Sequence, residues 1–285
     1  MSYVNDIETP VNRDRYVEID RNGGNGGNLD LIPQEISSLY CPNDLARQFV
    51  SESLGMYLFI LLSLGNIAIL VLYPESNMTW LGVGLSWGLN LMFGVYVASF
   101  NSGGHLNPCV SLCVFLFGDD FNFKQLCVYT LAQLFGSFLA AATVYGVYYN
   151  NISKIENGQS ATSIFTTYKH PSISTTSAFF TEFAGTALLV GGIFIILKHK
   201  ETSKHVPIYV GLLLSSLVLS FGFQSAFALN PARDLGPRIF MAMCGYNTFS
   251  YSDNYFWVPL VADYLGALFG VCVYIFLIKK QLKIE

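Results

Sequence analysis

Residues 228–238 read ALNPARDLGPR, and residues 102–111 read SGGHLNPCVS, so a Leu-Asn-Pro triplet occurs once in each half of the chain. A second motif, Glu-x-x-Gly, precedes each triplet and begins at Glu52 in the first half and at Glu182 in the second. Two motifs that recur in the same order predict an internal repeat.

The sequence around these motifs has the composition of a membrane protein. Of its 285 residues, 52% are hydrophobic and 12% are charged, whereas soluble domains average about 25% charged residues. A helix needs about 20 apolar residues to cross the hydrocarbon layer. Six stretches satisfy this length: 49–72, 80–100, 124–147, 177–197, 206–225 and 256–278.

Two shorter apolar stretches, 107–117 and 230–242, begin with Asn-Pro and cannot cross a bilayer alone. Half-length helices persist in a membrane only where protein or a water-filled cavity surrounds their ends. We therefore predict an all-α membrane protein with six transmembrane helices and two re-entrant half-helices. Because each half contains three spans, the second half must be inverted, an arrangement that places transport sites near the membrane midplane.

The chain divides by composition into a tail and a membrane domain. Residues 1–48 hold 12 of the 34 charged residues and an Asn- and Gly-rich run, which predicts a disordered cytosolic tail. A channel domain is expected over 49–280, with inverted halves at about 49–150 and 177–278, and residues 281–285 form a short cytosolic C-terminus. A net charge of −4 and six cysteines without a CxxC pair favour no nucleic acid, metal or cofactor.

Positive charges predict the orientation of the spans. Eleven of the 15 Lys and Arg residues lie in the cytosol if both termini do. The same orientation places both N-x-S/T sequons, at Asn77 and Asn151, outside as candidate glycosylation sites. We expect a multi-pass protein of the plasma membrane, with intracellular vesicles as the alternative.

The Asn-Pro motifs have a physical role as helix starts. Asn is a preferred N-cap, and Pro suits the first helical position because it has no N–H to leave unpaired. Two half-helix N-termini meeting at the midplane would repel cations and protons, while the Asn amides donate to a passing oxygen. The residues of the two motifs are Asn107, Pro108 and Cys109, and Asn230, Pro231 and Ala232.

Glu52 and Glu182 are acids within apolar spans, which are functional candidates by default. One interpretation is a proton relay. The other, which the symmetry favours, is that each carboxylate accepts backbone N–H bonds from a half-helix and its loop.

These motifs, the glutamates and the repeat resemble the major intrinsic proteins, the aquaporins, over about residues 46–280. The resemblance implies a homotetramer in which each subunit has its own pore for water or small neutral solutes. Cys109 stands where the family has Ala, and we leave open whether the thiol reacts with mercurials or packs inertly.

Within that family, Asp234 and the pair Pro259-Leu260 are similar to the glycerol-permeable branch. The resemblance implies structural support from His105 and Asp234, the latter through hydrogen bonds around Arg233. A Val where water-selective members have His predicts a wider, amphipathic constriction, with Arg donating to hydroxyl groups and aromatic walls facing carbon. The implied selectivity filter consists of Trp87, Val218, Phe227 and Arg233.

The segment 198–205 between the fourth and fifth spans is a candidate gate over the cytosolic mouth. It contains histidines, which titrate near physiological pH, and hydroxyls that could be phosphorylated. The alternative is a solvated positive loop, and shortening the segment would distinguish the two. The gate candidates are His199, Lys200, Thr202, Ser203 and His205.

We therefore expect a passive channel for water, glycerol and similar neutral solutes, and not an enzyme. A water-selective pore and a non-conducting junction or adhesion protein of the same fold remain alternatives. Asp263 in the last span has no assigned role, and a subunit contact or a wet surface would both accommodate it.

Overall fold

The computed structural model describes residues 16–20, 29–33, 44–118, 120–155 and 158–280. The chain divides into two compact units, Met1–Arg47 and Gln48–Glu285.

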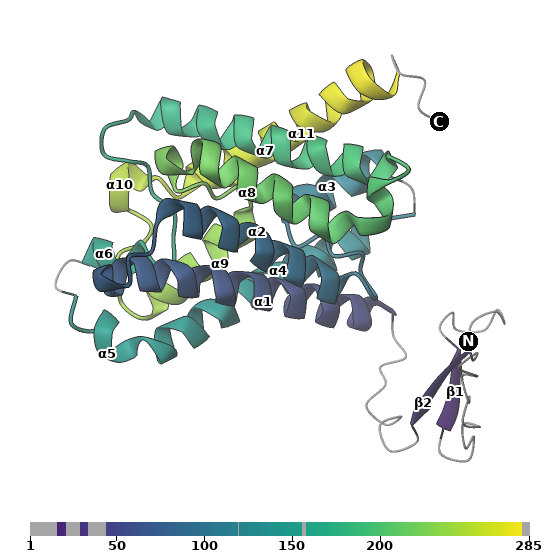
Figure 1. Ribbon diagram of the computed structural model, residues 1–285, viewed down its shortest axis with the longest axis horizontal. Helices are drawn as coiled ribbons and strands as arrows, with labels where there is room; N and C mark the ends of the chain where they lie inside the picture. Colours follow the sequence, from purple (N-terminus) through teal and green to yellow (C-terminus); the bar gives the residue numbers. More distant parts are fainter. Residues whose placement is uncertain (1–15, 21–28, 34–43, 119, 156–157, 281–285) are drawn as a thin grey trace, which may run out of the picture. The chain divides into compact units, whose positions relative to one another are not determined.

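The larger unit is helical (Figure 1). The six helices expected to span the membrane are confirmed, and each is long and apolar enough to do so. The last one continues as a π-helix, η5 (Tyr274–Lys279). The six are α1 (Asp44–Leu72), α2 (Trp80–Ala98), α4 (Phe123–Val147), α7 (Thr175–Lys198), α8 (Val206–Ser225) and α11 (Trp257–Val273).

Short helical turns lie in the connections between the spans. Two of them are 3-10 helices, η3 (Pro74–Ser76) and η4 (Thr202–His205). The others are α5 (Tyr149–Ile152), α6 (Gly158–Thr162) and α10 (Tyr251–Asn254).

The two half-helices begin at the Asn-Pro motifs, as predicted. They are α3 (Pro108–Phe117) and α9 (Pro231–Met243), with Asn107 and Asn230 as their N-caps. Each Asn side chain accepts a backbone N–H of the first turn, and Pro occupies the start of the helix, where no N–H is needed.

Close helix packing in one half recurs in the other. A Cβ added to Gly136 on α4 would collide with the carbonyl oxygen of Ser53 on α1, and one added to Gly266 on α11 would collide with that of Phe183 on α7. Both pairs are related by the same shift of 130 positions, which also relates Glu52 to Glu182. The inverted repeat is therefore preserved at the level of single contacts.

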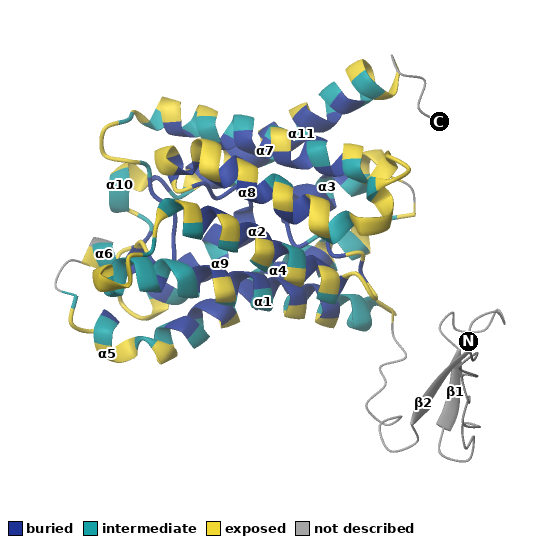
Figure 2. Ribbon diagram, viewed as in Figure 1, coloured by how far each residue is buried: buried dark blue, intermediate teal, exposed yellow. Residues whose placement is uncertain are grey.

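Burial follows the requirements of a bilayer. Buried residues face the inside of the helical unit, and exposed positions lie on its outer faces (Figure 2). Many of the exposed side chains are large and apolar, which suits contact with lipid. Examples are Leu81, Phe93, Leu131, Phe180 and Leu212.

The smaller unit differs from the expected disordered tail at two places. Strands β1 (Tyr16–Asp20) and β2 (Leu29–Pro33) pair antiparallel, with Tyr16 opposite Pro33 and Asp20 opposite Leu29. Apolar and polar residues alternate in Tyr16–Asp20, a period-2 pattern typical of strands. The Asn- and Gly-rich run, read above as a sign of disorder, lies between the strands and outside the described residues.

Candidate functional site

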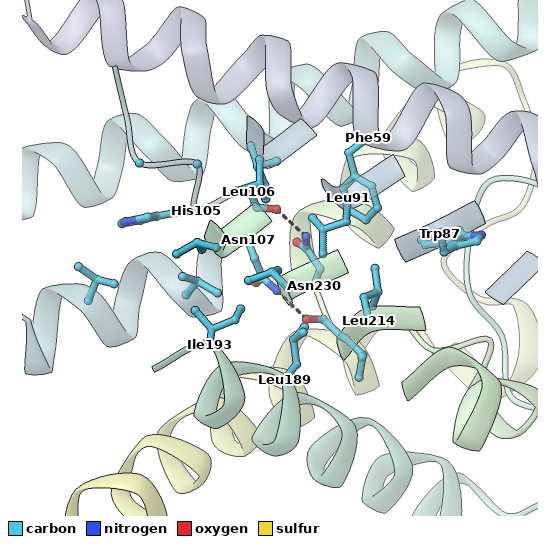
Figure 3. Close-up of a pocket in the computed structure, with 18 of the residues that line it drawn as sticks. Phe59, Trp87, Leu91, His105, Leu106, Asn107, Leu189, Ile193, Leu214 and Asn230 are labelled. Carbon is cyan, nitrogen blue, oxygen red and sulfur yellow. Dashed lines mark hydrogen bonds between the residues drawn. The ribbon is translucent and has the colours of Figure 1, made fainter. Parts of the chain in front are cut away.

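The two half-helices are joined by a pair of crossed hydrogen bonds (Figure 3). The Nδ2 of Asn107 donates to the carbonyl oxygen of Leu229 at 2.7 Å, and the Nδ2 of Asn230 donates to that of Leu106 at 2.7 Å. Each Asn therefore caps its own half-helix and donates a hydrogen bond to the loop that precedes the other half-helix. An Asn amide has two N–H donors, so each retains a second N–H for a passing oxygen atom.

Glu52 anchors the loop that leads into α3. Its carboxylate is fully buried and accepts the backbone N–H groups of His105 and Leu106, both at 2.9 Å. The side chains of Ser102 and Gln133 complete the set, each at 2.7 Å. A carboxylate with four donors is an acceptor in a fixed structure, which favours the structural interpretation over a proton relay.

Glu182 anchors the loop that leads into α9 in the same way. It accepts the backbone N–H groups of Ala228 and Leu229, both at 3.0 Å. This loop contains residues with left-handed backbone, including Phe227 at φ 53° and Leu229 at φ 51°. Such residues cost about 1–3 kcal/mol each, so the buried carboxylate holds a strained loop in place.

His105 supports the first loop through its side chain as well as its backbone. Its Nδ1 lies 3.1 Å from Ser111 Oγ on α3. The ring packs against those of Phe121 and Tyr129, with centroids 5.0 and 4.9 Å away. His105 thus links the loop to α3 and α4.

Two cavities adjoin each other, and we call the boundary between them, formed by Trp87, Phe227 and Arg233, the narrow point. The larger, of about 240 Å³, contains the two cap residues Asn107 and Asn230 in its lining. The smaller, of about 210 Å³, is lined by Val218 and Arg233 among others. Only two residues, Trp87 and Phe227, line both of these cavities. In Figure 3, His105 and Trp87 lie at opposite ends of the larger cavity, with both Asn side chains between them.

The narrow point combines aromatic rings with a fixed cation. The guanidinium carbon of Arg233 lies 4.6 Å from the ring centroid of Trp87, within cation–π range. Arg233 Nη1 donates to the carbonyl oxygen of Phe165 at 3.1 Å, which fixes its direction. Trp87 is in turn held edge-on by Phe59, with ring centroids 5.8 Å apart.

Asp234 holds the segment that positions Arg233. Its carboxylate accepts the backbone N–H and the hydroxyl of Thr167, both at 2.7 Å, two residues after Phe165. The expected support of Arg233 is therefore indirect and passes through residues 165–167. No bond joins Asp234 to the Arg233 side chain among the described contacts.

The sequence analysis assigned no role to Arg238. It is fully buried on α9, where its Nε donates to Asp234 at 2.7 Å and its Nη2 donates to the carbonyl oxygen of Thr167 at 2.8 Å. It also contacts the carbonyl oxygen of Thr248 and the ring of Tyr168. The i, i+4 spacing of an acid and an Arg on a helix was the available signal.

Cys109 is fully buried and lines neither cavity. Its position favours inert packing over reaction with mercurials. Among the described residues, no group of three His, Cys, Asp or Glu side chains could hold a metal ion.

The candidate gate lies outside the larger cavity. Residues 198–205 are all described and line neither cavity, although Leu197 and Val206 on either side of them line the larger one. The Thr202 hydroxyl donates to the carbonyl oxygen of Ile196 at 2.8 Å. The other gate candidates, His199, Lys200, Ser203 and His205, are exposed.

The two sequons differ in accessibility. Asn77 is exposed and ends the 3-10 turn η3 with φ 54°, whereas Asn151 is half-buried within the helical turn α5.

The sequence assigned no role to Asp263, and its position agrees with neither of the two surroundings considered for it, a subunit contact and a wet surface. It is fully buried within one chain, on α11, beside Glu182. Its residue type alone suggested exposure, because unpaired acids are rarely buried.

Comparison with known proteins agrees with this geometry. The major intrinsic protein family matches residues 41–274. Aquaglyceroporin-2 of Rhizophagus irregularis is 34% identical over 94% of this chain and 92% of its own length. Aquaporin-10 of Milnesium tardigradum is 34% identical over 84% of this chain, which spans only 64% of the length of that relative.

A solved structure gives the same result. The X-ray structure of the aquaglyceroporin from Plasmodium falciparum superposes with a TM-score of 0.77 at 32% identity, covering 85% of this chain and all of that one. The fold and the crossed half-helices thus define a six-span membrane channel built from an inverted repeat. The chain belongs to the major intrinsic protein family, in its aquaglyceroporin branch.

Proposed function

We propose that the chain forms a passive transmembrane pore that conducts water, glycerol and other small uncharged solutes and excludes ions and protons. The observation that carries this proposal is the narrow point between the two cavities. There, a fixed guanidinium donor, Arg233, stands beside the aromatic walls of Trp87 and Phe227. Hydroxyl groups of a linear polyol suit the donor, and its carbon chain suits the walls. No enzymatic step is part of this function.

Ion exclusion follows from the same geometry. The N-termini of α3 and α9 place partial positive charge beside Asn107 and Asn230. Arg233 adds a full positive charge at the narrow point. A cation would lose its hydration there without gaining a negative partner, whereas a neutral solute exchanges hydrogen bonds.

Stopped-flow light scattering on the full chain in liposomes tests the proposal, first with an impermeant osmolyte and then with a glycerol gradient. We expect rapid responses to both. A response to water alone would favour the water-selective alternative. Silence to both, with clustering of vesicles, would favour the junction or adhesion alternative.

The variant Arg233→Ala is expected to admit protons or other cations, measured with a pH-sensitive dye trapped in the vesicles. A matched control is Lys169→Ala, which removes a positive charge that pairs with Asp253 at 3.4 Å outside the narrow point. Unchanged ion exclusion in the Arg233 variant would contradict its assigned role.

Several features of the whole protein belong to the same proposal. We expect a homotetramer in a lipid bilayer, both termini in the cytosol, and residence in the plasma membrane. The orientation gains support because Arg233 and Arg238 are buried in α9, which leaves Lys154 and Lys169 as the outer-loop cations. Crosslinking in native membranes and protease protection of a tag on each terminus test the assembly and the orientation.

A further inference from the structure

The supports of the two half-helix loops correspond residue by residue, with one exception. Glu52 is contacted by the Ser102 hydroxyl, two backbone N–H groups and the amide of Gln133. Glu182 is contacted by the Ser225 hydroxyl, two backbone N–H groups and the carboxyl group of Asp263. Gln133 and Asp263 each follow their glutamate by 81 positions. An acid therefore stands in the second half where the first half has an amide.

Helix packing, as well as sequence spacing, shows that Gln133 and Asp263 are equivalent positions. Gly136 and Gly266 lie three residues after Gln133 and Asp263 and make equivalent close contacts with α1 and α7. Gln133 and Asp263 consequently occupy equivalent places on α4 and α11. Both side chains are fully buried.

An ionised Asp263 would have no backbone N–H donor in this place, and the hydroxyl of Thr186 is the one side-chain donor beside it among the described contacts. Neither of its carboxylate oxygens has a hydrogen-bond partner among the described residues, although Glu182 lies within hydrogen-bonding reach. The hydroxyl of Thr186 is buried beside Asp263 and can donate to no more than one of its two oxygens. Two ionised carboxylates side by side in an apolar interior repel each other, and one of such a pair retains a proton.

The contacts of Glu182 indicate which of the two acids donates in the hydrogen bond between Asp263 and Glu182. Its two oxygens already accept the N–H groups of Ala228 and Leu229, which stabilise the ionised form. Asp263 has no such donors and is the natural carrier of the proton. Its O–H then donates to Glu182, as the Nε2 of Gln133 donates to Glu52.

We propose that Asp263 and Glu182 share one proton, and that neutral Asp263 is the positioning residue that holds Glu182 beneath the second half-helix loop. The pair then carries a single negative charge. Loss of the shared proton at alkaline pH would place a second charge next to the loop whose Leu229 carbonyl accepts from Asn107. Permeability would therefore fall at alkaline pH through the second half alone.

Other titratable and charged groups face this pair from the surrounding elements. They tune the pH at which the proton is lost, and they are the same in the variants compared below. These groups are Cys109 on α3, Asp234 and Arg233 on α9, Tyr255 ahead of α11 and Tyr264 on α11.

Infrared spectroscopy of the full chain in liposomes tests the proton directly. We expect a carbonyl band of a protonated carboxylic acid at neutral pH that is lost in Asp263→Asn and that disappears from the native chain on alkaline titration. The matched variant Gln133→Glu builds the same acid pair in the first half and is expected to gain a second band. Absence of a band that depends on Asp263 would overturn the proposal, because the acid would then be ionised.

Glycerol flux tests the positioning role and rests on the proposed function, whereas the infrared result does not depend on transport. Asp263→Asn keeps a neutral donor and should retain flux without an alkaline loss. Asp263→Ala removes the donor and should lower flux by about tenfold or more at equal protein amounts, as expected for one lost hydrogen bond to a charged acceptor. Equal flux and equal thermal stability in the Asn and Ala variants would overturn the positioning role, even with the band present.

Discussion

The two halves of the channel share the residues that support the half-helices but differ in their buried charged residues. Both have an Asn cap, a buried glutamate and a Gly contact in equivalent places. In the first half the residue four after the cap is Ser111, and in the second it is Asp234. The second half also supplies Arg233 to the narrow point. The features that both halves share are those that hold the half-helices, and the buried charges Arg233 and Asp234 belong to the second half.

The largest expected effect comes from the buried ion pair of Asp234 and Arg238, which among the described residues has no counterpart in the first half. Asp234→Ala or Arg238→Ala leaves an unpaired charge in the interior, which costs about 3–5 kcal/mol of unfolding free energy. We expect a large drop in thermal stability in detergent and in the amount of folded protein. Ser111→Ala, the equivalent change in the first half, should cost about 1 kcal/mol.

A double variant sharpens this comparison. Removing Asp234 and Arg238 together eliminates both charges and should cost less than the two single changes added. Additive losses, or a loss in Ser111→Ala as large as in Asp234→Ala, would contradict the role of the pair.

The crossed bonds are shared equally, so breaking either should have a similar effect. Asn107→Asp and Asn230→Asp keep an oxygen that caps the helix but remove the amide that donates to the opposite loop. We expect water and glycerol permeability to fall about tenfold in each, as the loss of about 1.4 kcal/mol implies. Asn122→Asp, at the exposed cap of α4, is the control and should behave as the native chain.

A difference of more than tenfold in permeability between Asn107→Asp and Asn230→Asp would show that one of the two crossed hydrogen bonds matters more than the other. Such a result would contradict the symmetric role assigned to the caps.

A smaller effect is expected at Val218, which lies on α8 and lines the smaller cavity. Val218→His narrows this place and adds a polar group, which should lower glycerol permeability about tenfold while largely sparing water. Val218→Ile adds one methylene without polarity and serves as the size control. Equal loss of water and glycerol in the His variant would remove Val218 from the filter.

The smallest effect is expected at residues 198–205, which line neither cavity. Shortening this segment by removing 200–203 should raise permeability by less than about twofold if the segment is a solvated loop. Lys204→Ala, which breaks an exposed pair with Glu201, is the control. A severalfold increase at equal protein amounts would instead establish the segment as a gate.

The fold was predictable because its decisive features are local. A run of about 20 apolar residues identifies a span, and Asn-Pro identifies a helix start. Charge patterns depend on the fold and were less predictable. Asp234 and Arg238 form a local i, i+4 pair, but the contacts with Thr167 and Thr248 join segments that the sequence does not connect.

Asp263 illustrates the same limit. The role of Asp263 is inferred from its counterpart Gln133. That correspondence follows from helix packing and not from a sequence motif. The strands β1 and β2 were not predicted for a different reason, because the alternating residues form two short stretches on either side of a glycine-rich run that is typical of disorder.

The crossed caps also impose an order in time on synthesis. Asn107 leaves the ribosome 122 residues before its partner Leu229. At translation rates of about 5–20 residues per second, that interval is on the order of ten seconds. During this delay the first re-entrant helix has no carbonyl from the second half to receive its amide. Its final placement must therefore be a late event, completed only when the chain is nearly whole.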